Sequence, residues 1–309
     1  MTGKLGAIDI GTNSVLLLIA EPVVAGSSEL TPVIELATIT RLGEGVDRTR
    51  TLANAAVERT LACLATYAAV LKEHGVVTLD VVGTSAMRDA SGGDAFRAKA
   101  GDLLGVVPRV IAGSEEARLT FLGGLAGLKI DEDQSVVVFD IGGGSTEFIR
   151  GTRRGGPLGG ESLDVGSVRL TERCGHQDRW AAEHVARLDA EIDRALEKVT
   201  VRGAGARVVG VAGTTTSLFA IANGVEPYDA SRVHGGIMRR DEVLGVFERL
   251  ASSTQAERER MPGLSAKRAD VIVAGARLAH RVLRHLDAAE MIVSDRGVRW
   301  GLAHDLAGV

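Results

Sequence analysis

Two short stretches of the sequence bring a carboxylate, glycine and hydroxyls together in the same order. Residues 8–14 read IDIGTNS and residues 139–145 read FDIGGGS, so each places Asp, Ile and Gly ahead of a Ser. Asp, Gly and Ser are also common in ordinary β-turns, so a single match has little weight. Two matches, each following an apolar run and each in its own half of the chain, indicate a repeated unit with one kind of task.

The small residues of both stretches are suited to binding phosphate. A tight turn of small residues leaves backbone N–H groups pointing outward, and such concave groups of amides bind anions. The hydroxyls of Thr12, Ser14, Ser145 and Thr146 would add neutral donors without filling the turn. Each stretch is therefore a candidate phosphate-binding turn.

Carboxylates beside both turns are candidates for holding a metal ion. Asp9 and Asp140 each end a predicted strand just before the turn, and Mg²⁺ prefers carboxylates, water and phosphate oxygens. Glu147 follows Asp140 across the second turn, so both carboxylates could face one ion. The second copy is thus the more acidic of the two.

The elements around the turns are strands. Residues 5–9 and 15–20 flank the first turn, and residues 135–140 and 146–150 flank the second, so each half contains a strand–turn–strand unit. Helices are expected between further strands: residues 52–74 with Thr51 as the N-cap, and residues 263–286 as one long helix. Residues 151–162 are expected to form a loop or hairpin tip. Strands alternating with helices predict an α/β protein with mixed sheets.

Composition limits the classes of protein that remain. The chain has 309 residues, enough for about two domains. Its formal net charge is −4 and only 3% of its residues are aromatic, which argues against a nucleic-acid-binding surface. No apolar run approaches the length of a membrane span, and no signal peptide is recognised. We expect a cytoplasmic protein in which Cys63 and Cys174 are reduced, buried thiols.

The paired turns resemble the phosphate loops of the superfamily of actin, heat-shock chaperone ATPases and sugar kinases. Within it, eight ordered motifs resemble the exopolyphosphatase/guanosine-pentaphosphate phosphatase (Ppx/GppA) family, in a short form without the C-terminal helical domain of the His-Asp phosphohydrolase type. These motifs are IDIGTNSVLLLIAE, RLGEGV, GTSAMRDA, AGSEEARLTFLGG, VFDIGGGSTEF, GSVRLTER, GLSAKRADVIVAGA and SDRGVRWGL.

This resemblance implies an α/β fold with two actin-like (ribonuclease H-like) lobes, each a mixed sheet flanked by helices, and an active site in the interlobe cleft. The lobes would span residues 1–125 and 126–296, with a terminal helix at 297–309 packing back on the first. The implied activity is Mg²⁺- or Mn²⁺-dependent hydrolysis of a linear phosphoanhydride, and the family suggests a homodimer.

The resemblance also assigns roles to individual residues. Glu116, in AGSEEARLTFLGG, matches the general base that activates the attacking water. From the residues alone, Glu115 and Glu116 would simply complement a helix dipole, and Glu115 keeps that role. Asp140 and Glu147 match the metal carboxylates, with Asp9 as a further candidate. The phosphate cradle matches Gly11, Thr12, Asn13, Ser14, Gly142, Gly143, Gly144, Ser145 and Thr146.

Arg88, in GTSAMRDA, is the strongest arginine candidate. A guanidinium can make bidentate contacts with phosphate oxygens. The alternative is an ordinary surface ion pair with Asp89 or Asp94. Leu16 departs from the family, which usually has Arg or His at that position, and this bears on which phosphate chain is preferred.

The sequence therefore predicts an exopolyphosphatase that releases terminal orthophosphate, preferably from short polyphosphates. A guanosine pentaphosphate 5′-phosphohydrolase is the nearest alternative. An ATP-dependent kinase of the same superfamily and a non-catalytic polyphosphate or alarmone sensor are more distant alternatives. The match around Glu116 favours a hydrolase over both of these.

Overall fold

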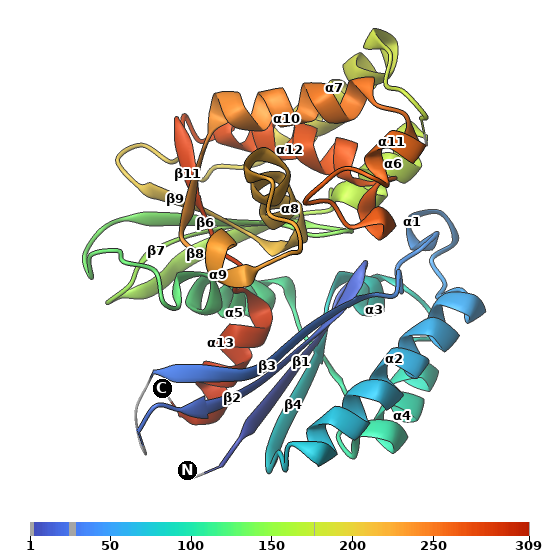
Figure 1. Ribbon diagram of the computed structural model, residues 1–309, viewed down its shortest axis with the longest axis vertical. Coiled ribbons are helices and arrows are strands. Elements are labelled where there is room, and N and C mark those ends of the chain that lie inside the picture. The colour runs from blue at the N-terminus through green and yellow to red at the C-terminus, as the bar shows by residue number, and fades with distance from the viewer. Residues whose placement is uncertain (1–2, 25–28, 176, 309) are drawn as a thin grey trace. The chain divides into compact units, whose positions relative to one another are not determined.

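The sheets of the two halves of the chain share one arrangement of four strands (Figure 1). Three consecutive strands form an antiparallel meander, and the first of them also pairs with a later, parallel strand. The computed structural model describes residues 3–24, 29–175 and 177–308. It divides into unit 1, Met1–Gly123 with Val298–Val309, and unit 2, Gly124–Gly297.

Unit 1 contains a five-stranded sheet in the order β3-β2-β1-β4-β5. Strands β1 to β3 are antiparallel, and β4 and β5 run parallel to β1. Every residue of β1 is buried, as expected for a strand covered on both faces. The strands are β1 (Leu5–Ile10), β2 (Ser14–Pro22), β3 (Leu30–Ile39), β4 (Thr78–Gly83) and β5 (Arg109–Val110).

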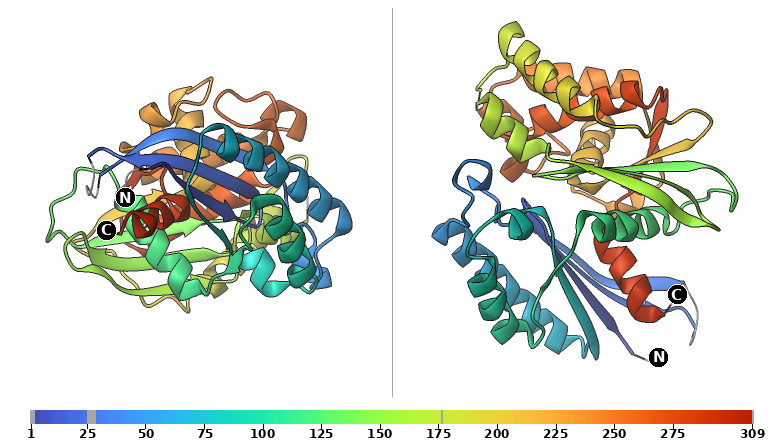
Figure 2. Two further views of the ribbon diagram at one scale, coloured as in Figure 1. Left: turned by 90° about the horizontal axis from the view of Figure 1, so that it is seen from below. Right: turned by 180° about the vertical axis from the view of Figure 1, so that it is seen from behind.

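Helices cover both faces of this sheet. Helices α2 (Asn54–Glu73) and α4 (Gly93–Leu104) lie on one face, where Leu64, Tyr67 and Phe96 join the core (Figure 1). The terminal helix α13 (Val298–Ala307) packs on β1, β2 and β4 from the other face (Figure 2). The remaining helices are α1 (Val46–Thr49), α3 (Ser85–Asp89) and α5 (Gly113–Leu125).

Unit 2 contains a six-stranded sheet in the order β10-β11-β9-β6-β7-β8. Strands β6 to β8 are antiparallel, β9 and β11 run parallel to β6, and β10 is antiparallel to β11. The strands are β6 (Val136–Ile141), β7 (Thr146–Thr152), β8 (Gly156–Leu163), β9 (Arg207–Val211), β10 (Gly236–Arg239) and β11 (Glu290–Val293).

The helices of unit 2 gather around α12, which packs against α6, α7, α8 and α10. Ten residues of α12 are buried, so it is the central helix of this core rather than an amphipathic surface helix. The helices are α6 (Ser167–Cys174), α7 (Ala182–Leu196), α8 (Ala212–Asn223), α9 (Ala230–Val233), α10 (Arg240–Ser252), α11 (Gln255–Arg258), the 3₁₀ turn η1 (Ala266–Arg268) and α12 (Ile272–His285).

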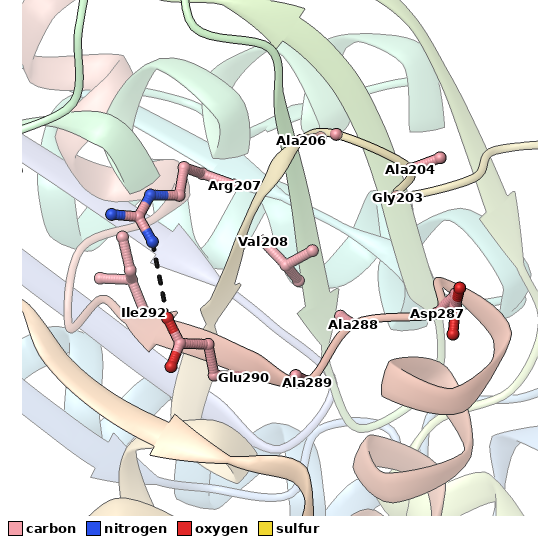
Figure 3. A pocket seen from close by; sticks show the side chains of 11 residues that line it. Gly203, Ala204, Ala206, Arg207, Val208, Asp287, Ala288, Ala289, Glu290 and Ile292 are labelled. Atoms are coloured by element: carbon pink, nitrogen blue, oxygen red, sulfur yellow. Dashed lines mark hydrogen bonds and ion pairs between the residues drawn. The ribbon is translucent and has the colours of Figure 1, made fainter.

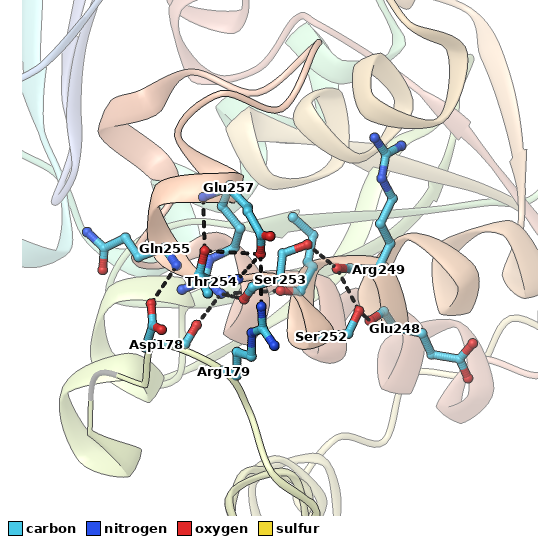
Figure 4. Close-up of polar contacts among 11 residues, drawn as sticks. Asp178, Arg179, Glu248, Arg249, Ser252, Ser253, Thr254, Gln255 and Glu257 are labelled. Atoms are coloured by element: carbon cyan, nitrogen blue, oxygen red, sulfur yellow. Dashed lines mark hydrogen bonds and ion pairs between the residues drawn. The ribbon is translucent and has the colours of Figure 1, made fainter.

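A buried arginine holds the corner between α10, α11 and α12. Arg258 is fully buried, and its guanidinium donates hydrogen bonds only to backbone carbonyls among the described residues. These carbonyls belong to Gln177, Asp178, Leu250, Ser253 and Ala269. Around it, Thr254 and Glu257 form a capping box that starts α11 (Figure 4).

Three expectations about local structure were wrong. Thr51 is not the N-cap of α2, which begins after Ala53, because Thr51 bridges to Ser91 instead. Residues 151–162 contain the expected hairpin tip only at 153–155, and the rest is strand, since β8 pairs with β7 on both sides of a register shift despite three glycines. The long helix expected at 263–286 is shorter, because η1 and a turn precede α12.

The predicted fold class is confirmed: the chain is α/β, with two lobes that each contain a mixed sheet flanked by helices. The division between Gly123 and Gly124 lies close to the predicted boundary at 125/126. Both Cys63 and Cys174 are buried and free. Within the described residues, none of the helices combines the length and the apolar character that a membrane span needs.

Candidate active site

The two glycine turns are closed by the same hydrogen bond. In unit 1 the Gly11 amide donates to the carbonyl of Ser14 at 2.9 Å, and in unit 2 the Gly142 amide donates to the carbonyl of Ser145 at 3.1 Å. A Cβ added at Gly11 or Gly142 would lie 3.1 or 3.3 Å from that same serine oxygen. Glycine therefore allows the tight closure in both copies.

The carbonyls of the first turn are bound by the segment that follows β3. The amides of Thr40 and Arg41 donate to the Asn13 carbonyl at 3.0 and 2.9 Å, and the Gly43 amide donates to the Thr12 carbonyl at 2.9 Å. A Cβ at Gly43 would lie 2.3 Å from the Thr12 methyl, so only glycine fits against the turn. The RLGEGV motif is thus a clamp on the first turn.

The start of α6 holds the second turn in the same manner. The Ser167 amide donates to the Gly142 carbonyl at 3.0 Å, and the amides of Val168 and Arg169 donate to the Gly143 carbonyl at 2.9 and 3.1 Å. Gly166 lies so close that an added Cβ would be 2.5 Å from the Gly143 oxygen. The GSVRLTER motif therefore does in unit 2 what RLGEGV does in unit 1.

These clamps use the carbonyls of the turns and leave their amides available. Within the described residues, the backbone N–H groups of Thr12, Asn13, Gly143 and Gly144 make no hydrogen bond. Adjacent unpaired amides in a turn are the chemistry of an anion site. The Asn13 side chain is buried, and its Oδ1 accepts no hydrogen bond from the described part of the chain, so it remains available to a donor such as water.

Thr146 differs from the other predicted phosphate ligands. Its hydroxyl is buried and donates to the carbonyl of Val165 at 2.7 Å, so its single proton is already used inside unit 2. Its backbone pairs with Ile141 in the β6–β7 ladder. The geometry gives Thr146 a role in holding the turn rather than in donating to phosphate.

The two carboxylates of the second copy lie side by side. Asp140 on β6 is the register partner of Glu147 on β7, so both side chains emerge on one face of the sheet. Glu147 is buried, and its Oε1 accepts a hydrogen bond from the Ser162 hydroxyl at 2.9 Å. In the first copy, Asp9 faces Leu16 in the same register.

This pair fits a magnesium ion better than a transition metal. No group of three or more His, Cys, Asp or Glu side chains with metal-ligand geometry occurs in the described ranges 3–24, 29–175 and 177–308. Two adjacent carboxylates beside a phosphate turn are nevertheless a suitable donor set for Mg²⁺, which is usually held by one or two carboxylates plus water and phosphate oxygens.

The predicted base lies in unit 1, in the first turn of α5. The Glu116 side chain is buried, and its Oε2 accepts a hydrogen bond from Arg88 Nη1 at 3.0 Å. Burial raises the pKa of Glu116, while the positive charge and hydrogen bond of Arg88 oppose that rise. The neighbouring Glu115 instead pairs with Arg118, which lowers the pKa of Glu115.

Arg88 is more than a surface ion-pair partner. Its Nη1 also donates to the carbonyl of Ile111 at 3.1 Å, and its Nε lies 3.9 Å from Asp89. Asp94, the other expected partner, pairs with Arg97. The sequence did not predict the pairing of Arg88 with Glu116, because the two residues lie on separate elements whose approach depends on the tertiary fold.

A cavity of about 460 Å³ lies elsewhere in unit 2 (Figure 3). It is lined by the starts of β9 and β11, where Arg207 Nη1 lies 3.5 Å from Glu290 Oε1. Because β9 runs parallel to β6, this cavity lies at the amino-terminal ends of these strands, whereas the Gly142 turn follows the carboxyl end of β6. Ligands of parallel sheets bind at the carboxyl ends of strands, so the turn is the better candidate.

Comparisons with known proteins agree with the motifs. The Ppx/GppA phosphatase family matches residues 19–308. Exopolyphosphatase 2 of Mycobacterium tuberculosis is 38% identical over 319 residues, which is 99% of each chain. A crystal structure of the Aquifex aeolicus Ppx/GppA family member has a TM-score of 0.82 at 32% identity, covering 98% of this chain and 97% of that one. An exopolyphosphatase from Cytophaga hutchinsonii has a TM-score of 0.88 at 25% identity, covering 99% and 98%.

Proposed function

The chain belongs to the Ppx/GppA phosphatase family, and from this membership we propose that it is an exopolyphosphatase that releases terminal orthophosphate from inorganic polyphosphate with the help of Mg²⁺. Membership makes the chain a hydrolase. The observation that carries the proposal further is the buried Glu116 carboxylate held by Arg88. A buried carboxylate with a guanidinium beside it is suited to activating water next to a phosphate.

Glu116 acts as the general base. It accepts a proton from the water that attacks the terminal phosphorus, at a lone pair that the hydrogen bond from Arg88 does not use. The raised pKa of Glu116 brings its basicity closer to neutral pH, where proton transfer from water is more favourable. Burial also excludes bulk solvent from the carboxylate.

The backbone amides of the glycine turns bind phosphate oxygens. They are fixed by the clamps at Gly43 and Gly166 before substrate arrives, so little reorganisation is needed when charge builds up in the transition state. Arg88 adds N–H donors from unit 1, because its side chain keeps about a quarter of its surface exposed, at 26%. Phosphoryl transfer depends mainly on such positioning and charge stabilisation.

Asp140 and Glu147 would hold the metal ion, with Mn²⁺ as a substitute for Mg²⁺. When bound there, the ion supplies positive charge that neutralises the transferring phosphoryl group. The Ser162 hydroxyl fixes the Glu147 carboxylate by donating to it. Asp9 is a further candidate on the first copy, where Leu16 supplies no second carboxylate.

Guanosine pentaphosphate is the second candidate substrate. The motifs resemble a family that includes guanosine-pentaphosphate phosphatases, and the terminal phosphoanhydride of guanosine pentaphosphate would present the same kind of phosphate to Glu116. Nothing in the turns themselves requires a long phosphate chain, because their amides act on individual phosphate oxygens. The two substrates are therefore compared directly in the experiment.

The experiment measures phosphate release from polyphosphates of defined length, guanosine pentaphosphate and ATP, with Mg²⁺ or with a chelator. We expect release from polyphosphate only with the metal, and a loss of about 10²- to 10⁴-fold in kcat for Glu116→Gln. Glu115→Gln is the matched control, since Glu115 is the residue next to Glu116 in the chain but pairs with Arg118 instead of Arg88. Full activity of E116Q would refute the base, and polyphosphate binding without release would favour a sensor.

A further inference from the structure

One arginine of α2 holds the clamp on the first phosphate turn from outside. Arg59 Nε donates to the Thr40 carbonyl at 3.0 Å, and Arg59 Nη2 donates to Glu44 Oε2 at 2.7 Å. These two acceptors lie at the two ends of residues 40–44, the segment whose amides bind the turn. Between them, the buried Leu42 anchors the segment in the core of unit 1.

The bond from Arg59 to Thr40 is transmitted to the turn through one rigid peptide group. The Thr40 carbonyl and the Arg41 N–H belong to the same peptide group, which is trans, so they point in opposite directions. The Arg41 N–H donates to the Asn13 carbonyl at 2.9 Å. Arg59 therefore holds one side of the peptide plane whose other side binds the turn.

The second contact of the clamp sets the direction of an amide that the turn offers to phosphate. The Gly43 amide donates to the Thr12 carbonyl at 2.9 Å. That carbonyl shares a trans peptide group with the Asn13 N–H, which consequently points the opposite way, out of the turn. Glu44, the residue after Gly43, is the one that Arg59 binds. The guanidinium thus acts on both sides of the contact that aims the Asn13 amide.

The backbone of the clamp needs such support. Arg41 has a φ of 54°, in the left-handed region that residues with a Cβ rarely adopt. A strained residue of this kind persists only where the surrounding contacts hold it in place. In unit 2, packing supplies that support, because α12 packs on α6 and a Cβ at Gly275 would lie 3.2 Å from the Ser167 Cβ. In unit 1, Arg59 supplies part of it from an exposed surface, with 44% of its side chain exposed.

We propose that Arg59 is a positioning residue for the first phosphate turn: its guanidinium holds residues 40–44 in the geometry that aims the Asn13 amide at a phosphate oxygen of the substrate. This inference rests on the proposed phosphohydrolase function. Arg59 acts through the clamp rather than on the phosphate, because Glu44 already neutralises its charge and the Thr40 carbonyl occupies its Nε.

The first experiment measures the kinetics of phosphate release from polyphosphate for Arg59→Met, Glu44→Gln and Lys72→Met. Lys72→Met is the matched control, because it removes one positive charge from the exposed last turn of the same helix. We expect R59M to raise KM by about tenfold while kcat changes less than about threefold, since the turn binds phosphate and Glu116 is untouched. K72M should stay close to the unchanged protein.

Glu44→Gln separates positioning from direct phosphate binding by Arg59. If Arg59 positions the clamp, E44Q loosens one of its two contacts and raises KM, by less than R59M does because the bond to Thr40 remains. If Arg59 bound the phosphate itself, E44Q would free the guanidinium and lower KM. A lower KM for E44Q would therefore overturn the inference.

Hydrogen exchange of the substrate-free protein gives a measurement that does not depend on activity. The amides of Arg41 and Gly43 donate to the turn, and we expect both to exchange at least about fivefold faster in R59M and at the same rate in K72M. The inference requires both effects, so an unchanged exchange rate or an unchanged KM in R59M overturns it. If no substrate releases phosphate, the proposed function fails, and the exchange rates still decide whether Arg59 holds the clamp.

Discussion

Asp9 and Asp140 occupy the same register in their two hairpins but face different partners. Asp140 is opposite Glu147, whereas Asp9 is opposite Leu16. A carboxylate pair attracts a divalent cation, and an aspartate beside a leucine does so much less. Both copies therefore contain the turn but differ in their other candidate groups: unit 2 has the carboxylate pair, and unit 1 has the buried Glu116 that we propose as the base.

Replacing Glu147 by Gln should weaken the binding of the metal ion. We expect the Mg²⁺ concentration for half-maximal phosphate release to rise by at least about tenfold, because a charged ligand becomes neutral while its shape is kept. Glu161→Gln is the control, since Glu161 is opposite Phe148 and hence on the other face of the sheet. An unchanged Mg²⁺ titration curve for E147Q would rule out Glu147 as a ligand.

At the residue scale, the sequence predicts what lies close along the chain and misses what tertiary folding brings together. The spacing of Asp140 and Glu147 across a turn is enough to place them on one face, and the register agrees. The contact of Glu116 with Arg88 joins α5 to α3, and no local pattern reports it.

At the element scale, loops and helix starts outside the repeats decide how the turns are built. The segment after β3 and the start of α6 have different secondary structures, yet both donate amides to the carbonyls of a turn. Strand–turn–strand periodicity predicts the hairpins well, because alternation and glycine are local. It cannot predict which later segment binds the turn, since the bonded residues lie 27–31 positions apart in unit 1 and 25–26 positions apart in unit 2.

Arg258 gives a stability prediction for the corner between α10, α11 and α12. Arg258→Met removes the buried donors to five backbone carbonyls, and we expect a loss of at least about 3 kcal/mol in the free energy of unfolding, measured by urea denaturation. Arg249→Met is the control, because Arg249 is exposed on α10 (Figure 4). Equal urea midpoints for R258M and R249M would show that backbone carbonyls there are satisfied without the guanidinium.

This corner also explains an element that the sequence misread. The apolar periodicity of residues 263–286 is typical of one long helix. Instead, Arg258 Nε binds the carbonyl of Ala269, in the turn that joins η1 to α12. A helix running through residue 269 would commit that carbonyl to an amide four residues later, so a long-range side-chain contact competes with the local pattern.

At the scale of the whole molecule, unit 1 is built from two separate pieces of the chain. Helix α13 joins residues 298–309 to residues 1–123, and Trp300 is fully buried there. Arg299 and Trp300 both donate to the Glu35 carboxylate on β3, at 2.6 and 3.2 Å. The first unit is therefore complete only when the last helix is in place.

Gly301 provides a test confined to unit 1. A Cβ at Gly301 would lie 2.2 Å from the carbonyl oxygen of Leu119, so Gly301→Ala should separate α13 from α5 at a cost of about 1–3 kcal/mol. Hydrogen exchange should speed up in β1, β2 and β4 while β6 and β9 remain protected. Gly297→Ala is the control, because a Cβ there meets nothing within 4 Å. Equal loss of protection in both sheets would mean that the two units do not unfold separately.

Because unit 1 consists of two separate chain segments, its folding during synthesis on the ribosome differs from that of unit 2. Unit 2, Gly124–Gly297, is one uninterrupted stretch, and all of it leaves the ribosome before Val298 does. The second unit can therefore finish folding first, although the first unit begins first. Until α13 is synthesised, the face of the unit 1 sheet that it covers is exposed to water and to other nascent chains. Burial of Trp300 is therefore a late step in the folding of unit 1.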